Sequence, residues 1–277
     1  MTKLIALLSL LFLALPAVAL ADDPPRYKPY YAIFDRGDAK IPGHDTRWVP
    51  QGLTYWPQRD ALLISYYDGQ KQKNSRLAAI DRASGKRLQL YELHDDGHVG
   101  ALAIAGPYLW VGDSGTLHRF DLSVLDATGE LPRIEPSADF DVKASSFATV
   151  EGDRLWLGDF NRGSDSAAYR YAVGAGGELT YDGTQIHAPS NAQGLAITGG
   201  TAIWSRSFGR DNDSRIDIGP LGGDSFARSI VAPNMSQNMV IAQGELHVLY
   251  ESGSAVYDDA DYRVRTVHHG PIEKVLG

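Results

Sequence analysis

The chain of 277 residues contains no cysteine, so it can form neither a disulfide bond nor a lipid anchor on a cysteine side chain. A protein of this composition depends on its hydrophobic core and its backbone hydrogen bonds for stability. The chain also lacks a basic block, since 26 Lys and Arg stand against 34 Asp and Glu and the net charge is −8. Nucleic acids are bound by clustered basic side chains, and we therefore expect no nucleic-acid partner.

Familiar catalytic motifs are also missing. The sequence has no G-x-S-x-G nucleophile turn, no H-E-x-x-H zinc helix and no phosphate-binding P-loop. The glycine-rich segment 174–177 is not followed by a helical pattern that could present amides to a phosphate, so it reads as a turn. These absences exclude the common sequence signatures of serine hydrolases, zinc peptidases and nucleotide-binding proteins.

Long hydrophobic runs are absent except at the start of the chain. A lysine precedes an apolar run over residues 4–15, and small residues at positions 19 and 21 follow it. This order predicts a secretory signal peptide over residues 1–21, cleaved after Ala21. A membrane anchor is the alternative, but the run is shorter than the roughly 20 apolar residues of a transmembrane helix. We expect a periplasmic or secreted protein without a membrane span, with one domain over residues 22–277.

The rest of the chain carries an internal repeat. A short apolar strand recurs five times with a period of 44–47 residues, at Ala61–Ser65, Leu109–Gly112, Leu155–Gly158, Ala202–Ser205 and Leu246–Leu249. A second apolar motif precedes each of these strands by about one strand length, and a third strand follows each one. A fourth strand is recognisable in some repeats, as in segments 87–91 and 226–231.

A period of this length with about four short strands is typical of a β-propeller blade. A β-sandwich also has many short strands, but it has no reason to repeat the same strand triplet five times. We predict an all-β, five-bladed propeller with four-stranded blades, and a sixth blade only if the chain ends form one. The strand predicted over residues 30–34 would join a strand near residues 262–265 and close the ring, which removes exposed sheet edges.

Two residue types recur at fixed places in the repeat. The tryptophans of the second strands are expected in the core between blades, and they are Trp110, Trp156 and Trp204. A hydroxyl residue opens each third strand, and we expect it to bond the backbone of the connecting turn. These hydroxyl residues are Ser75, Thr116, Ser166, Ser214 and Ser254.

Several short segments of the sequence resemble those of a known family. They are Gln51–Thr54, Gly97–Ile104, Ser205–Arg210 and Tyr250–Gly253. With this blade pattern the chain resembles secreted bacterial propeller proteins of unassigned activity. It is more distantly similar to the superfamily of regucalcin-like gluconolactonases, paraoxonases and strictosidine synthase-like proteins. The resemblance covers the mature chain as a blade pattern and implies the propeller fold rather than a reaction.

The propeller topology brings certain polar residues together. Each innermost strand begins, and each second strand ends, at the same mouth of the central channel, so the side chains there converge. The predicted ligand-binding residues are Gln51, Tyr66, His98, Asp113, Asp159, Asn191, Gln193, Arg206, Gln237 and Glu251. The alternative is that this polar ring is only solvated, as channels of propellers commonly are.

The resemblance to the lactonase superfamily implies a divalent ion in the channel, held by one Glu with Asn and Asp residues. Here Gln51 stands at the first-blade position expected for the Glu, which removes the strongest anionic ligand. Asp113, Asp159 and Asn191 remain as oxygen donors if calcium binds. We otherwise expect neither a metal nor another cofactor.

Two functions follow from these residues. The favoured one is a non-catalytic, exported module that binds a small molecule, a glycan or a protein at the channel mouth, as a monomer. The alternative is a calcium-assisted hydrolase of lactone or ester type, in which His98 acts as general base and the ion polarises the carbonyl group.

Overall fold

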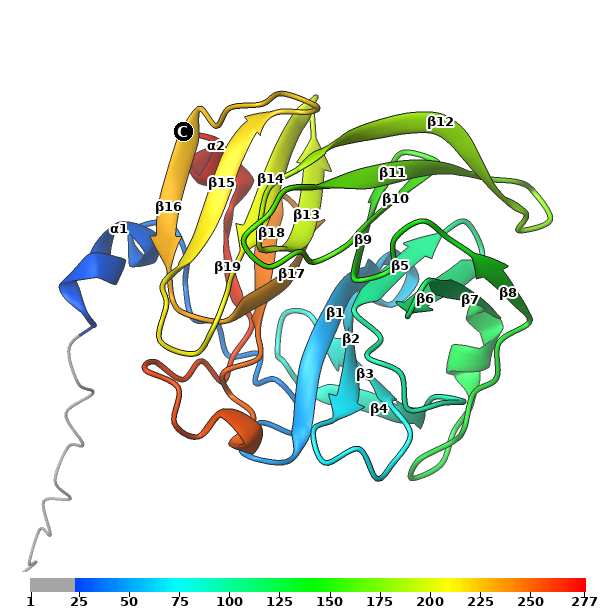
Figure 1. Ribbon diagram of the computed structural model, residues 1–277. Coiled ribbons are helices and arrows are strands. Elements are labelled where there is room, and N and C mark those ends of the chain that lie inside the picture. Colours follow the sequence, from blue (N-terminus) through cyan, green and yellow to red (C-terminus); the bar gives the residue numbers. More distant parts are fainter. Residues whose placement is uncertain (1–22) are drawn as a thin grey trace, which may run out of the picture.

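The computed structural model describes residues 23–277, which form five antiparallel β-sheets arranged in a ring (Figure 1). Each sheet is one blade, and the first strands of the five blades contact one another around the central channel. The predicted five-bladed propeller is therefore confirmed, and the described residues form no sixth blade. The predicted signal peptide, residues 1–21, lies outside the described residues.

Four blades have four strands each, numbered from the channel outward. Blade 1 comprises β1 (Trp48–Trp56), β2 (Ala61–Asp68), β3 (Arg76–Asp81) and β4 (Arg87–Glu92). Blade 2 comprises β5 (Ala101–Ala105), β6 (Tyr108–Asp113), β7 (Thr116–Asp121) and β8 (Ala138–Asp141). Blade 3 comprises β9 (Phe147–Glu151), β10 (Arg154–Gly158), β11 (Ser166–Val173) and β12 (Leu179–Ala188). Blade 4 comprises β13 (Ala192–Thr198), β14 (Thr201–Arg206), β15 (Ser214–Pro220) and β16 (Arg228–Ala232).

Blade 5 has only three strands, β17 (Ser236–Ala242), β18 (Glu245–Tyr250) and β19 (His268–Pro271). The segment after Ser254, expected as its third strand, instead forms the 3-10 helix η4 (Ala255–Tyr257). The Ser254 hydroxyl accepts a hydrogen bond from the backbone N–H of Val256, which caps this helix and ends the extended conformation.

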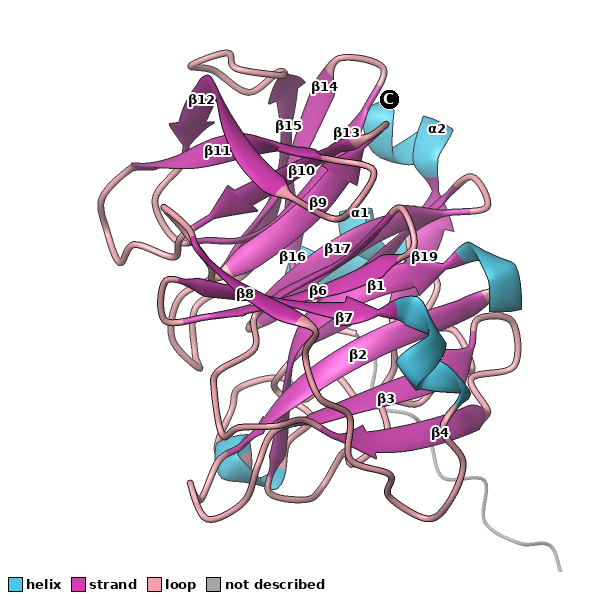
Figure 2. Cartoon of the chain, turned by 90° about the vertical axis from the view of Figure 1, so that its right-hand side faces the viewer, coloured by secondary structure: helices cyan, strands magenta, loops and turns pink. Residues whose placement is uncertain are grey.

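The helices are short and lie at the margins of the sheets (Figure 2). They are η1 (Pro25–Tyr27), α1 (Lys28–Tyr31), η2 (Pro57–Arg59), η3 (Leu122–Asp126), η4 and α2 (Ile272–Leu276). Within residues 23–277 no helix has the length and apolar character needed to cross a membrane.

The N-terminal segment reaches the last blade, but not as the predicted strand. Residues 28–31 are helical as α1, since Pro29 in the first turn favours the helical φ and removes a strand donor. Beyond α1, isolated bridges join Asp35 to His269 and Lys40 to Thr266. The segment after α1 therefore fastens the outer edge of blade 5 through these bridges and through the N–H of Ile41, which donates to the carbonyl of Arg265, rather than through a strand over residues 30–34.

The hydrophobic core is divided into five clusters, one between each pair of neighbouring blades. Side chains of the second strands alternate between two of these clusters. In β2, Leu62 and Ile64 pack toward blade 5, whereas Ala61 and Leu63 pack toward blade 2. Because each blade has two apolar faces, it buries both only between neighbours.

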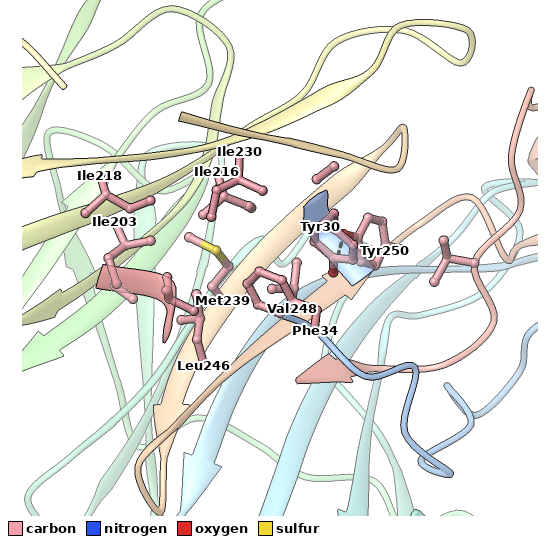
Figure 3. Packing of buried hydrophobic residues seen from close by; sticks show 14 residues of the cluster. Tyr30, Phe34, Ile203, Ile216, Ile218, Ile230, Met239, Leu246, Val248 and Tyr250 are labelled. Carbon is pink, nitrogen blue, oxygen red and sulfur yellow. Dashed lines mark hydrogen bonds between the residues drawn. The ribbon is translucent and has the colours of Figure 1, made fainter. Parts of the chain in front are cut away.

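Aromatic residues contribute much of this packing. Trp110 lies in the cluster between blades 2 and 3, and Trp156 and Trp204 lie in the cluster between blades 3 and 4, as predicted. Between blades 4 and 5, the N-terminal Tyr30 and Phe34 join the core near Met239 and Val248 (Figure 3). The N-terminal segment is thus part of the core of the ring.

Serine hydroxyls connect neighbouring blades. The Ser75 hydroxyl donates to the carbonyl of Gly97 at 2.5 Å, ahead of the first strand of blade 2. The Ser214 hydroxyl accepts from the backbone N–H of Ser236, where blade 5 begins. The Ser254 hydroxyl donates to the carbonyl of Thr46, which precedes blade 1. The predicted bond to the connecting turn is found for Ser166, whose hydroxyl donates to the carbonyl of Asp159, and for Ser254, which caps η4. The bonds of Ser75 and Ser214, and that of Ser254 to Thr46, instead reach the next blade.

Candidate functional site at the channel mouth

Three glutamines lie at equivalent irregularities of the innermost strands. The β1–β2 pairing shifts register between Pro50 and Leu53, around Gln51. The pairing of β13 shifts around Gln193, and that of β17 shifts around Gln237. A bulge turns a side chain away from the regular alternation of the sheet. The three amides are therefore presented at the end of the channel where the first strands begin, which we call the mouth.

The ring is narrow at the mouth because glycines let neighbouring blades approach closely. A Cβ atom on Gly100 would lie 2.3 Å from the carbonyl oxygen of Ser146 in blade 3. On Gly52 it would lie 2.5 Å from Cβ of Leu102 in blade 2. The hollow part of the channel, about 320 Å³, lies toward the other ends of the first strands. Its lining combines the aliphatic side chains of Ile104, Ile197 and Ile241 with Thr54 and Thr149, so it is both polar and apolar.

Glu251, which follows β18, is the most perturbed carboxyl group at the mouth. Its Oε2 accepts a hydrogen bond of 2.9 Å from Nε2 of Gln51, and the side chains of Gln237 and Tyr257 lie close enough to favour its ionised form. Loss of water around the half-buried side chain raises the pKa of Glu251 from 4.5 to about 7, although these neighbours and the charge of Arg210 oppose the rise. A carboxyl group with this pKa exchanges a proton near neutral pH.

Aromatic side chains extend the site from Glu251 across the mouth. The Tyr257 hydroxyl lies 2.9 Å from the hydroxyl of Tyr67, and the Tyr67 ring stacks on His98 with 4.3 Å between ring centroids. His98 is open to solvent on its other side, yet the surrounding protein lowers its pKa, so the ring is neutral at pH 7. We call Gln51, Gln237, Glu251, Tyr67, Tyr257 and His98 the Glu251 cluster.

A polar hollow of about 470 Å³ adjoins His98 and is lined from blades 2 and 3. Asp113 and Asp159 both line it, as predicted. Each also holds the turn where a first strand begins, since Oδ1 of Asp113 accepts from the N–H of His98 and Oδ1 of Asp159 accepts from the N–H groups of Ser145 and Ser146. The two carboxylates are thus fixed in place by backbone donors, and the lining contains no Lys or Arg.

Two predicted residues of blade 4 lie apart from this hollow. Asn191 and Arg206 line a separate hollow of about 330 Å³. The Arg206 guanidinium bonds the carbonyl of Ser190 and pairs at 2.8 Å with Asp217, which is buried. Arg206 therefore braces blade 4 and does not converge on Glu251. The three oxygen donors expected for calcium are likewise divided between two hollows, since Asn191 is separated from Asp113 and Asp159.

Tyr66 does not line the mouth. It is 2% exposed and packs in the core between blades 5 and 1, whereas the next residue, Tyr67, faces His98. Successive residues of a strand point to opposite faces, so an error of one position in the end of β2 selects the wrong tyrosine. Tyr257 was also missed, because the sequence pattern placed it in a strand of blade 5.

No protein-family model matches the chain, and no curated protein matches it in sequence. Among solved structures, the glutaminyl cyclase of Myxococcus xanthus is similar with a TM-score of 0.54 and 12% identity over 76% of this chain and 90% of that one. A luciferin-regenerating enzyme gives a TM-score of 0.47 and 11% identity over 83% and 94% of the two chains. This likeness shows the fold alone.

Proposed function

We propose that the protein is an exported propeller that binds a small, amine-bearing polar molecule at the channel mouth. The observation that carries this proposal is the environment of Glu251, whose polar neighbours Gln51, Gln237 and Tyr257 are all neutral. The nearest cation that acts on it, Arg210, pairs with Asp259 instead. A ligand ammonium group supplies the missing positive charge.

The surroundings of Glu251 suit the same ligand. The Tyr67 and Tyr257 side chains offer aromatic surface, and the adjoining hollow contributes two carboxylates without a basic residue in its lining. Aromatic rings and carboxylates together attract ammonium groups. The ligand lies over His98, with its amine toward Glu251 and its hydroxyl or amide groups toward Asp113 and Asp159. Export rests on the predicted signal peptide.

The test compares glucosamine with N-acetylglucosamine by calorimetry and thermal shift on the mature chain, with putrescine as an amine of different shape. We expect the amines to bind and the neutral acetylated sugar to bind at least tenfold more weakly. Equal binding of the two sugars would show recognition of hydroxyl groups and overturn the proposed charge recognition. No binding by any amine up to about 10 mM would also overturn it.

Glu251→Gln keeps the shape of the side chain and removes its charge, so it should weaken amine binding at least tenfold at pH 8. Asp258→Asn is the matched control, because Asp258 is an exposed carboxylate next to Tyr257. In the parent protein, the affinity for putrescine, whose alkylamines stay protonated over this range, should fall about tenfold from pH 8 to pH 6, because the ionised fraction of a group with a pKa of about 7 falls by that factor. Affinity that is independent of pH would contradict the role of Glu251.

A hydrolase of lactone or ester type is the second candidate. It is favoured by one observation: His98 is neutral at pH 7, as a general base must be, and shares a hollow with Asp113 and Asp159. No carboxylate orients its ring, since Asp113 accepts from the backbone N–H of His98. Hydrolysis of γ-butyrolactone with calcium, lost in His98→Ala, would support this function over simple binding.

A further inference from the structure

Two imidazole rings and a carboxylate meet outside the mouth, between blades 1 and 2. His94 and Asp95 follow β4, and His118 lies in β7. Oδ2 of Asp95 lies 3.1 Å from Nε2 of His94 and 3.6 Å from Nε2 of His118, and the two rings are 4.4 Å apart between centroids. Within residues 23–277 this is the one group of three or more His, Cys, Asp or Glu side chains close enough to share a metal ion.

The hydrogen bond on the far side of His118 determines how its ring faces Asp95. Nδ1 of His118 lies 2.7 Å from Oδ1 of Asp139, and an ionised carboxylate can only accept, so the proton is on Nδ1. In the neutral ring, Nε2 then carries a lone pair that points toward another acceptor, Oδ2 of Asp95. A positive charge between these two atoms, either a metal ion or the second proton of an imidazolium, would hold them at this distance.

The spacing fits a transition-metal ion. With zinc–nitrogen bonds of about 2.0–2.1 Å, the edge of a tetrahedral site is about 3.3 Å, which lies between the two measured nitrogen–oxygen separations. Desolvation lowers the pKa of His94, which keeps its ring neutral and able to ligate at pH 7. The carboxylate of Asp139 bonds Nδ1 of His118, and metal-binding histidines commonly donate their second ring N–H to such a carboxylate.

The backbone around the three side chains is also held in place. The carbonyl of Asp95 accepts from the N–H of Ser75, and its Oδ1 accepts from the N–H of Gly97. Nη2 of Arg133 donates to the carbonyl of His94. The side chains of His94, His118 and Asp95 are 18%, 10% and 35% exposed, so a bound ion could be reached by water as its fourth ligand.

We propose that His94, Asp95 and His118 form a binding site for a divalent transition-metal ion of the zinc type, with Asp139 as a positioning residue. The ligand set of two imidazoles and one carboxylate favours such an ion over calcium, which takes six to eight oxygen ligands. The site is separate from the Glu251 cluster, and the proposal is independent of the proposed function.

The test uses the mature chain without a histidine tag, stripped of metal with a chelator and dialysed. Calorimetric titration with Zn²⁺ should show one tight equivalent, and Co²⁺ should give the visible absorption of a tetrahedral site. His118→Ala and His94→Ala should each lose the tight equivalent. His187→Ala is the matched control and should keep it, because His187 also faces a carboxylate, Asp165 at 2.8 Å, but without a second imidazole.

Two results would overturn the site: no Zn²⁺ binding by the parent protein at about 100 μM, or equal loss of binding in His187→Ala. Circular dichroism of each variant in chelator must match that of the parent protein, so that a loss reports the ligands and not unfolding. Asp139→Asn should keep the stoichiometry and weaken Zn²⁺ binding about 10–100-fold. Unchanged affinity in Asp139→Asn would remove that residue from the site.

Discussion

At the scale of single residues, Glu251 illustrates how the surroundings decide the charge of a carboxyl group. The amide of Gln51 and the hydroxyl of Tyr257 favour its ionised form, but the loss of water outweighs them and the pKa rises to about 7. Asp68 shows the opposite case. Arg47 and two backbone N–H groups bind its buried carboxylate, and its pKa lies well below the usual range. Burial alone therefore does not predict the charge of an acidic residue.

The raised pKa predicts how Glu251→Gln changes stability with pH. In the parent protein, the stabilising effect of the protonated group is complete below the unfolded pKa of 4.5 and is lost as pH rises toward about 7. The variant does not titrate there, so its melting temperature relative to the parent should rise between pH 4.5 and pH 8.

Melting curves of both proteins across this range give the measurement. Buried His247 and His268, whose pKa values are lowered to about 3 by desolvation, destabilise both proteins in acid and cancel in the difference. A constant difference between variant and parent from pH 4.5 to pH 8 would show that Glu251 has an ordinary pKa.

Arg206 lies at the end of a second strand, as the sequence predicted, but its side chain holds blade 4 together and does not face the mouth. Its place at the end of β14 suggested the mouth, but its guanidinium is held by Asp217 and Ser190 within blade 4. Asp217 is 1% exposed, and a buried carboxylate binds the nearest cation strongly because water cannot replace it. A sequence that shows only spacing does not reveal such a partner.

At the scale of elements, the mouth depends on departures from regular strands. The register shifts around Gln51, Gln193 and Gln237 present three amides, while glycines at the same level bring the first strands together. The repeated sequence segments at these places predicted the first strands correctly. The irregularity of the strands at these places depends on contacts between blades, which the repeated segments do not record.

Close approach of blades 2 and 3 predicts the effect of a methyl group at Gly100. Gly100→Ala would place Cβ against the backbone oxygen of Ser146, which cannot move aside without shifting blade 3. We expect a loss of about 1–3 kcal/mol in the free energy of unfolding, as for overpacked cores. Denaturant unfolding of the purified variant measures it.

Gly174→Ala is the matched control for this substitution. There the nearest atom is the carboxylate of Glu178, the end of a flexible side chain that can turn away. It should change stability by no more than about 0.5 kcal/mol, as for other exposed positions. Equal losses from the two substitutions would contradict the proposed tight contact between blades.

At the scale of the whole molecule, the ring is closed by two distant parts of the chain. Blade 5 is built from C-terminal strands, while α1 packs against β16 and Asp35 pairs with His269 (Figure 1). Tyr30 connects these parts, since its hydroxyl accepts from the Tyr250 hydroxyl at 2.8 Å and lies 3.0 Å from Nδ1 of His268. The N-terminal segment thus secures the junction of blades 4 and 5.

Removal of residues 23–37 should therefore destabilise the entire ring. The deletion takes Tyr30 and Phe34 out of the core, and loss of one large core aromatic costs about 3–5 kcal/mol. We expect one cooperative transition at a melting temperature more than about 10 °C lower, or no folded protein. Calorimetry is the measurement.

Arg26→Ala controls for the loss of the segment's surface ion pairs, with Asp213 and Asp261, and should change the melting temperature little. A truncated protein that melts with the parent would show that closure depends on the C-terminal strands alone.

The sequence alone determined the propeller, its five blades and the place of the tryptophans, because these follow from a hydrophobic period that each blade repeats locally. It also placed Gln51, Gln237, Glu251 and His98 near one another, since strand starts and ends share one face of a closed ring. Tertiary structure alone decided the rest. Which of two adjacent tyrosines faces the mouth depends on a register of one residue, and the partners of Arg206 and His118 depend on contacts within folded blades. The pKa of Glu251 depends on how much water the assembled ring removes, which no local pattern records.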